Sequence, residues 1–240
     1  MIKQANYKTT PGANAKKLKM AIGGDLGMNT AGKKMTLNLI AYSPDVIIIG
    51  GDTTYDDGMR TCYSSWDDFY SLFEPVYTHP SINRLIPLIL SVGNHDVGFD
   101  ALTENKITTS EEYLPLFFVL NPQHVSHSGD VPAIFDRLSY HSHLIGPTLH
   151  LNLDSGYLKH HREQVDFIKL QSQSNKNRYL FANYHNPIYP SCTNSHENSN
   201  DRKVIAAGLK YWTPLFDSFG FIASLEHHTH QRKITFKIKN

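Results

Sequence analysis

One pattern recurs along the chain and limits what it can fold into. A short apolar run ends in glycine and is followed by a side chain that can bind a metal ion. The run Val46–Ile49 has no polar interruption and leads into Gly50, Gly51 and Asp52. Such a run is typical of a strand buried on both faces of a parallel sheet. Because ligands of open α/β sheets bind beyond the carboxyl ends of the strands, Asp52 is expected at a functional site.

Two other runs have the same design. Residues 18–22 are apolar and lead through two glycines to Asp25, and residues 87–92 lead through Gly93 to Asn94 and His95. If the three runs are parallel strands, their carboxyl ends meet at one edge of a sheet. The side chains of Asp25, Asp52, Asn94 and His95 are then expected to lie close together.

The segments between these strands have helical spacing. Apolar residues predict one helix over Thr30–Tyr42, which Pro44 ends, and another over residues 66–77, which carry aromatic side chains on one face. The order strand, helix, strand, helix, strand implies a mostly parallel sheet covered by helices, an α/β fold.

The second half of the chain predicts a second sheet with further helices. Residues 97–130 are expected to be a long loop with short helical or strand pieces. Strands are expected over residues 134–139, 149–153, 178–182, 221–225 and 233–239, and helices over residues 161–173 and 203–219. Two of these strands lead to histidines, namely His185 and the pair His228 and His230.

Composition narrows the class of protein. The 240 residues can form one core, so we expect a single domain over residues 1–240, with residues 1–17 as an extended lead-in. The 23 Lys and Arg nearly balance the 22 Asp and Glu, which leaves no basic field for nucleic acid. No apolar run reaches the roughly 18 residues of a membrane span, and the first residues lack a signal-peptide core. These observations do not assign the protein to a cellular compartment.

The groups at the five strand ends are all oxygen or nitrogen ligands. Such a set suits iron, manganese or zinc. The groups are too many for one tetrahedral zinc but suit two neighbouring ions, with Asp52 able to bridge both. The residues are Asp25, Asp52, Tyr55, Asn94, His95, His185, His228 and His230.

The order of these motifs resembles that of the calcineurin-like metallophosphoesterases. The motifs that carry the resemblance are Asp25-Leu26-Gly27, Gly51-Asp52-Thr53-Thr54-Tyr55, Gly93-Asn94-His95-Asp96, His185 and His228-Thr229-His230. Tyr55, three residues after Asp52, makes the chain similar to the purple acid phosphatase branch. The resemblance implies a sandwich of mixed β-sheets flanked by helices, in two or four layers.

The resemblance also implies roles for individual residues. Asp25, Tyr55 and His230 would hold a ferric ion, and Asp52 would bridge it to a second ion. Asn94, His185 and His228 would hold that second ion, which is Zn²⁺, Mn²⁺ or Fe²⁺ in this branch.

The implied activity is hydrolysis of phosphoric monoesters by a metal-bound hydroxide at this binuclear centre. His95 would hydrogen-bond the phosphate or the leaving oxygen of a small phosphorylated substrate. His196 resembles a further substrate-binding histidine. A phosphodiesterase of the same superfamily is the nearest alternative, and a non-catalytic metal-binding or phosphate-binding module is the alternative from another class.

The sequence departs from the pattern of these families near its end. Glu226 and His227 stand where an apolar residue and a glycine are usual, and Gln231-Arg232-Lys233 replaces a usual tyrosine-glutamate-arginine run and keeps only a positive charge. Relatives continue with several more strands, so we expect the C-terminal strands to be truncated. The chain is then either a minimal protein or a fragment.

The other histidines are expected to be structural or exposed, because a lone histidine in a strand-rich region seldom binds a metal. His227 stays undecided, since it adjoins His228. Asp154 is expected to be a turn residue. The histidines expected to be structural or exposed are His79, His124, His127, His141, His143, His150, His160 and His161.

Overall fold

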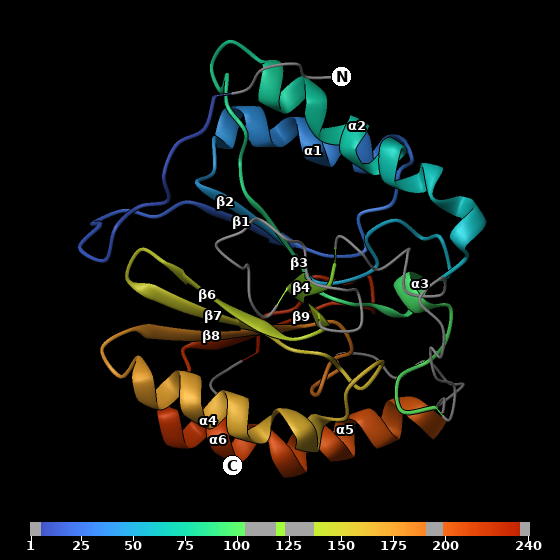
Figure 1. Ribbon diagram of the computed structural model, residues 1–240, viewed down its shortest axis with the longest axis vertical. Helices are drawn as coiled ribbons and strands as arrows, with labels where there is room; N and C mark the ends of the chain where they lie inside the picture. Colours follow the sequence, from blue (N-terminus) through green and yellow to red (C-terminus); the bar gives the residue numbers. More distant parts are fainter. Residues whose placement is uncertain (1–5, 104–118, 123–136, 191–198, 236–240) are drawn as a thin grey trace.

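The computed structural model describes residues 6–103, 119–122, 137–190 and 199–235. Two sheets lie face to face, and helices cover the outer face of each, so the chain forms a sandwich of four layers (Figure 1). The expected α/β fold with mixed sheets is confirmed, in its four-layer form.

The first sheet is parallel and carries two helices. Its order is β1 (Met20–Gly23), β2 (Val46–Ile49) and β3 (Leu88–Leu90). The helices α1 (Thr30–Tyr42) and α2 (Ser64–Thr78) cross over between these strands and cover one face. The sequence predicted both helices and all three strands to within a few residues.

The two faces of β2 explain the layered arrangement. Ile47 and Ile49 pack in the cluster that contains Phe69 of α2, while Val46 and Ile48 pack in the cluster formed with the second sheet. All four β2 side chains are at most 5% exposed. Burying such a side chain stabilises a fold by about 1.5–3 kcal/mol relative to leaving it exposed. The unbroken apolar run therefore suits a strand between helices and a second sheet.

The second sheet is mixed. Strands β6 and β7 pair antiparallel, and β7, β8 and β9 pair parallel. Their order in the sheet is β6 (His141–Ile145), β7 (Thr148–Asn152), β8 (Tyr179–Tyr184) and β9 (Ala223–Glu226). The sequence did not predict β6, whose His-Ser-His start resembles a polar loop.

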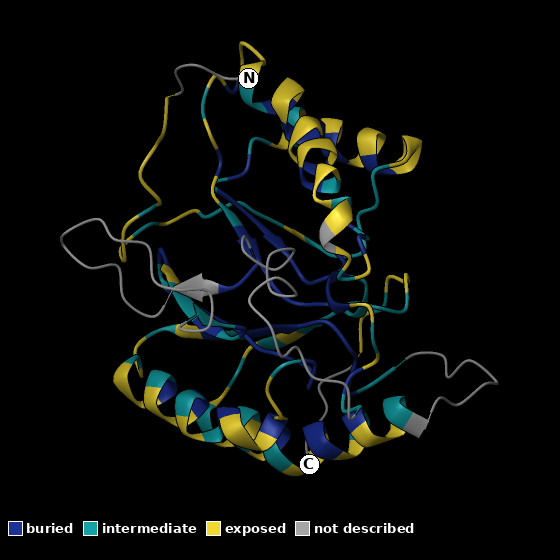
Figure 2. Cartoon of the chain, turned by 45° about the vertical axis from the view of Figure 1, so that its right-hand side comes forward, coloured by how far each residue is buried: buried dark blue, intermediate teal, exposed yellow. Residues whose placement is uncertain are grey.

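Helices on the far side of the second sheet complete the core. The helix predicted over residues 203–219 is two helices that meet at Trp212, which is fully buried. The elements of this layer are the short 3-10 helix η4 (His161–Gln164), α4 (Val165–Ser174), α5 (Ser199–Tyr211) and α6 (Thr213–Phe219). Buried residues gather along the sheets and on the inner faces of the helices, while the outer faces are exposed (Figure 2).

Several short elements lie outside these layers, and some predictions are corrected there. Of residues 134–139, only β5 (Arg137–Leu138) is a strand among the described residues, and it pairs with β4 (Asn121–Pro122) in a small separate sheet. The described part of the predicted last strand, residues 233–235, is not in a strand. The remaining short elements are the 3-10 helix η1 (Arg60–Cys62) and α3 (Asn94–Val97).

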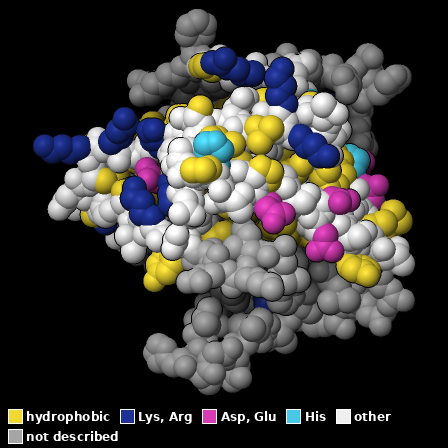
Figure 3. Space-filling model, turned by 90° about the horizontal axis from the view of Figure 1, so that it is seen from above, with side chains coloured by type: hydrophobic (Ala, Val, Ile, Leu, Met, Phe, Trp, Pro, Cys, Tyr) yellow, Lys and Arg dark blue, Asp and Glu magenta, His cyan; other side chains and the backbone are white. Residues whose placement is uncertain are grey.

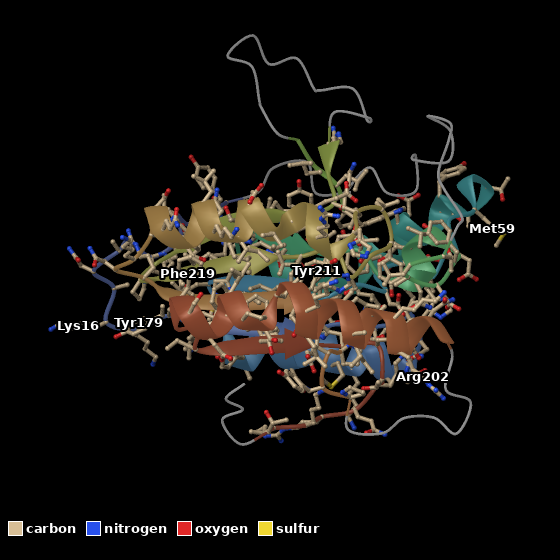
Figure 4. All side chains as sticks on the ribbon, turned by 90° about the horizontal axis from the view of Figure 1, so that it is seen from below. Lys16, Met59, Tyr179, Arg202, Tyr211 and Phe219 are labelled. Carbon is tan, nitrogen blue, oxygen red and sulfur yellow. The ribbon has the colours of Figure 1, made fainter. Side chains whose placement is uncertain are left out.

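The two ends of the sandwich differ. Figure 4 shows Lys16 and Tyr179, the first residue of β8, at one end, with Met59 and Arg202 at the opposite end. On the face over α1 and α2, Lys and Arg side chains lie at the left, at the top and right of the centre of the view, while most Asp and Glu side chains lie toward the right (Figure 3). No helix in the described ranges is both long and apolar enough to cross a membrane.

Three histidines of the second half are buried in the sandwich, as expected for structural residues. His141 bonds the carbonyl of Leu90 through Nε2 at 3.1 Å, and His150 stacks on Phe181. His161 is fully buried against Trp212, with 4.1 Å between the ring centroids, and its two ring nitrogens have no hydrogen-bond partner among the described residues. Burial lowers the pKa of His141 and of His161 to about 3 and that of His150 to about 4.

These histidines predict a loss of stability in mild acid. The unfolded chain binds protons as the pH falls below about 6.5, while the folded state keeps His161 neutral down to about pH 3. His161 therefore contributes a destabilisation that grows as the pH falls. Replacing it with Phe, which fills a similar volume without polar nitrogens, should remove this contribution.

We expect the free energy of unfolding of His161→Phe to rise relative to wild type by about 2 kcal/mol between pH 7 and pH 5. Urea unfolding followed by circular dichroism at both pH values measures this difference. His79→Phe, at an exposed histidine, controls for the loss of one imidazole. A difference between His161→Phe and wild type that does not change with pH would contradict the prediction.

Candidate metal centre

Candidate ligands from both sheets converge at the carboxyl ends of the strands. Two groups of side chains could each hold a metal ion: Asp52 with His185 and His228, and Asp25 with Asp52 and His230. Within each group, the ligand atoms lie within 4.8 Å of one another. Asp52 belongs to both groups, so its carboxylate lies between two candidate ion positions.

His185 presents one ring nitrogen to this site. It follows β8 and is fully buried. Its Nδ1 donates to the carbonyl oxygen of Gly50 at 2.9 Å, which leaves the lone pair of Nε2 directed at the site. Facing Nε2 are Asn94 Oδ1 at 3.0 Å and Asp52 Oδ1 at 3.3 Å.

His228 reaches the same point from β9. Its Nδ1 lies 3.0 Å from Asn94 Oδ1 and 3.2 Å from His185 Nε2. The backbone N–H of His228 donates to Asp25 Oδ2 at 2.9 Å. The loop after β9 is thereby bound to the loop after β1, in the other sheet.

Asp25 and His230 form the outer part of the site. His230 Nε2 lies 3.2 Å from Asp25 Oδ1, and the side chain of His230 is 62% exposed. Asp25 Oδ1 is buried and accepts no hydrogen bond from the described residues, so its approach to His230 is not that of a hydrogen-bonded pair. A buried oxygen in this position suits a cation.

The donor set fits metal ions. Around His185 Nε2, an amide oxygen and a carboxylate oxygen both offer lone pairs, so a positive charge is needed where the three atoms meet. Burial opposes the imidazolium, but the bond to Asp52 and the charges of Asp52 and Asp25 outweigh it and raise the pKa of His185. An extra proton or a bound metal ion can supply the charge, and oxygen and nitrogen ligands suit iron, manganese and zinc.

The two carboxylates respond oppositely to this environment. Burial and the charge of Asp52 raise the pKa of Asp25. Burial also disfavours ionised Asp52, yet its bond to His185 and the positive charge of that ring lower the pKa of Asp52. Asp52 is therefore the carboxylate that stays ionised most readily.

The backbone is strained where it presents these groups. Asp25, Asp52, Tyr55, His228 and His230 all have φ between 52° and 68°, in the left-handed region. Residues with side chains adopt this region at a cost of about 1–3 kcal/mol each. Strain of this kind accumulates at functional sites, and in this chain it accompanies five of the candidate ligands.

Tyr55 and His95 lie together beside the carboxylates. Their ring centroids are 4.7 Å apart. Burial raises the pKa of Tyr55, and the charges of Asp52 and Asp25 add to the effect, which places the phenol near both carboxylates. The backbone N–H of His95 donates to Asp52 Oδ1 at 2.9 Å.

Two carboxylates that the sequence analysis did not select support this arrangement. Asp57 Oδ1 accepts a hydrogen bond from His95 Nδ1 at 2.6 Å. Asp96 is buried and accepts the backbone N–H groups of Asp52, Thr53 and Gly93. Burial and the charge of Asp52 raise the pKa of Asp96 to about 7. The position of Asp57, two residues after Tyr55, was the only sequence signal for a role near the site. No periodic pattern indicates that it contacts His95.

Most of the residues predicted for the site lie together in the structure. The structure brings Asp25, Asp52, Asn94, His185, His228 and His230 together, with Tyr55 and His95 beside them. His196 lies outside the described residues. Asp154 accepts backbone N–H groups of Gly156, Tyr157, Leu158 and Lys159, so it is a turn residue as expected.

The sequence profile of the calcineurin-like phosphoesterases matches residues 18–231. The chain belongs to this family. Its members use a binuclear metal centre, which agrees with two ligand groups that share Asp52. The match includes every candidate ligand.

Individual relatives are more distant. Metallophosphoesterase 1 of Danio rerio is 34% identical over 71 residues, which are 29% of this chain and 18% of that protein. Metallophosphoesterase 1 of Xenopus laevis is 38% identical over 56 residues, or 23% of this chain and 13% of that protein. Purple acid phosphatase 15 of Arabidopsis thaliana is 24% identical over 262 aligned residues, which cover 100% of this chain and 45% of that protein. The chain spans less than half the length of each relative.

His227, which the sequence analysis left undecided, has a packing role. Its ring lies against the backbone of Gly50 and Gly24, and its Nε2 bonds Asn183 Oδ1 at 3.0 Å. Asn183 also donates to Asn152 and Ser91, which joins the two sheets. His227 is therefore a structural residue that packs between the loops after β1 and β2 and the second sheet.

The packing of His227 predicts that a side chain at Gly50 is not tolerated. A Cβ on Gly50 would overlap the ring of His227 at Cδ2, a clash that cannot be relieved without moving the ring. Gly50→Ala should therefore lower the free energy of unfolding by about 2–4 kcal/mol, and adding His227→Ala should recover part of that loss.

Chemical denaturation of the single and double variants measures this coupling. Gly12→Ala is the matched control, because nothing lies within 4 Å of a Cβ at Gly12. Strictly additive losses at Gly50 and His227 would show that the two residues do not touch in solution.

Proposed function

We propose that this chain is a metal-dependent hydrolase of phosphoric monoesters, of the acid phosphatase type, folded as one catalytic domain. The observation that carries the proposal is the position of Asp52, whose carboxylate is common to both candidate ligand groups. A shared carboxylate suits two ions held about 3.5–4 Å apart, the arrangement of hydrolytic two-metal sites. Family membership supports phosphoester hydrolysis in general, and the monoester assignment is ours.

We assign the ligands to two positions. Asp25, Tyr55 and His230 would hold Fe³⁺, with Asp52 bridging. Asn94, His185 and His228 would hold Zn²⁺, Mn²⁺ or Fe²⁺. The contacts of His185 Nε2 with Asn94 and Asp52, and the unbonded Asp25 Oδ1, support the two positions.

Bound ions would supply Lewis acidity and a nucleophile at neutral pH. The chain itself orients His95, because Asp57 holds Nδ1 and leaves Nε2 to face the substrate. The His95 side chain is 41% exposed, so a substrate can reach it. Its role is to hydrogen-bond the phosphoryl group or the leaving oxygen as charge develops there.

Small phosphorylated molecules are the proposed substrates, and His196 is proposed as a second substrate contact. Tyr55 beside the carboxylates favours the purple acid phosphatase branch and hence monoesters. The alignment of the whole chain with Purple acid phosphatase 15 supports the same choice. A phosphodiesterase would use the same ligands, so the choice is tested on paired substrates.

The metal-loaded protein should hydrolyse p-nitrophenyl phosphate faster than its bis-ester, and a chelator should abolish both activities. His95→Asn should lower kcat for the monoester roughly 100-fold, because it removes a donor at the developing charge. His79→Asn, at an exposed histidine, is the matched control and should leave kcat unchanged.

Faster hydrolysis of the bis-ester would favour the phosphodiesterase alternative. Folded protein that binds two ions but cleaves neither ester would indicate a non-catalytic binding module. Protein that binds no metal after reconstitution would overturn the proposal.

Tyr55 provides a separate spectroscopic test. A tyrosinate bound to Fe³⁺ should give a broad visible charge-transfer band, and Tyr55→Phe should lose that band while keeping about two metals per chain. Absorption spectroscopy with metal analysis on both proteins measures this. Tyr70→Phe, on the surface of α2, should keep the colour. A coloured Tyr55→Phe protein would exclude Tyr55 as the ligand.

A further inference from the structure

A partly buried ion pair outside the ligand groups joins the two segments that carry the histidines. Glu226 ends β9, and its side chain is only 4% exposed. Its Oε2 pairs with Nζ of Lys233, whose side chain is 19% exposed. Glu226 and Lys233 thus enclose His228 and His230 in the sequence.

The other carboxylate oxygen of Glu226 binds the segment around His185. Glu226 Oε1 accepts the hydroxyl of Tyr184 at 2.8 Å and the backbone N–H of Ile188 at 2.9 Å. Tyr184 immediately precedes His185, and Ile188 follows it by three residues. Lys233 also donates to the carbonyl oxygen of Tyr189.

One carboxylate therefore fixes both segments to each other. His185 and His228 come from neighbouring strands, and their facing nitrogens are 3.2 Å apart. Small shifts of either loop would separate them, because no regular structure follows β9 within residues 227–235. The Glu226–Lys233 pair links this segment to the residues on either side of His185.

The pair is placed differently from exposed ion pairs of the chain. Lys159 and Glu163 are four residues apart in the sequence, and their side chains are 47% and 53% exposed. Exposed pairs of that kind contribute little to stability. In contrast, the carboxylate of Glu226 is almost inaccessible to water, so removing Lys233 leaves a buried charge uncompensated and destabilises this part of the fold.

We infer that Glu226 and Lys233 are positioning residues of the metal centre, which hold His185, His228 and His230 at metal-binding distances. Neither residue belongs to the two candidate ligand groups. The inference rests on the metal-dependent function proposed above, and it adds two residues to those that build the site.

The test is metal binding by three variants of the full chain. Glu226→Gln keeps an acceptor for Tyr184 and Ile188 but leaves the ammonium of Lys233 unpaired. Lys233→Met removes that ammonium, and Lys233→Arg keeps the charge. Lys159→Met is the control at an exposed pair. Titration with Co²⁺ gives the affinity and stoichiometry, and the visible spectrum of bound Co²⁺ reports its coordination geometry.

We expect Glu226→Gln and Lys233→Met to bind Co²⁺ about 10–100-fold more weakly, with an altered spectrum, as is typical when groups that orient ligands are lost. Lys233→Arg should remain near wild type, and Lys159→Met should equal it. Each titration is made below the melting temperature of that variant, so that unfolding does not enter.

A purely structural role would give a different result. Folded Glu226→Gln and Lys233→Met would then melt at lower temperature but bind Co²⁺ with wild-type affinity and spectrum, which would overturn the inference. If Glu226→Gln does not fold, Lys233→Met and its rescue by Lys233→Arg decide the question alone. Failure of the wild-type protein to bind Co²⁺ would instead overturn the proposed function, and this inference with it.

Discussion

Lone pairs that face one another are the constraint on which the metal centre depends. His185 Nε2, Asn94 Oδ1 and Asp52 Oδ1 approach within hydrogen-bond distance, although the Nδ1 of the ring is already bonded to Gly50. Such an arrangement needs a positive charge between these atoms, which either a proton on Nε2 or a bound metal ion supplies. The surrounding structure holds it in place through strained backbone at Asp52 and His228 and through bonds that fix each ring.

The sandwich makes this convergence possible because it places the carboxyl ends of two sheets side by side. Asp52 comes from the first sheet, and His185 comes from the second. Hydrophobic contacts hold the sheets together at Val46 and Ile48, as does the buried hydrogen bonding of Ser91 and Asn183. A polar contact buried at a sheet interface fixes one alignment of the sheets, since a shift would leave its groups unpaired.

The departures from the usual family pattern form a consistent local set. His227 fills space above the glycines that follow β1 and β2, and Glu226 pairs with Lys233. Taken singly, each substitution weakens the resemblance. In the folded chain, both occupy positions where they join the loop after β9 to the rest of the site, so they are compatible with an intact ligand set.

The sequence by itself determined the helices and strands whose apolar pattern shows which side is buried. It also determined the identity of the candidate ligands. β2 and α1 were predicted at their observed bounds, because an unbroken apolar run and a segment of helical spacing that ends before a proline need no distant partner to be recognised. The tertiary structure decided the rest. β6 begins with His141, which is buried where it bonds Leu90 of the other sheet, and the pairs Asp57–His95 and Glu226–Lys233 follow from how loops meet. Periodicity records which face of an element is buried, but it holds no information on which distant polar group will lie opposite.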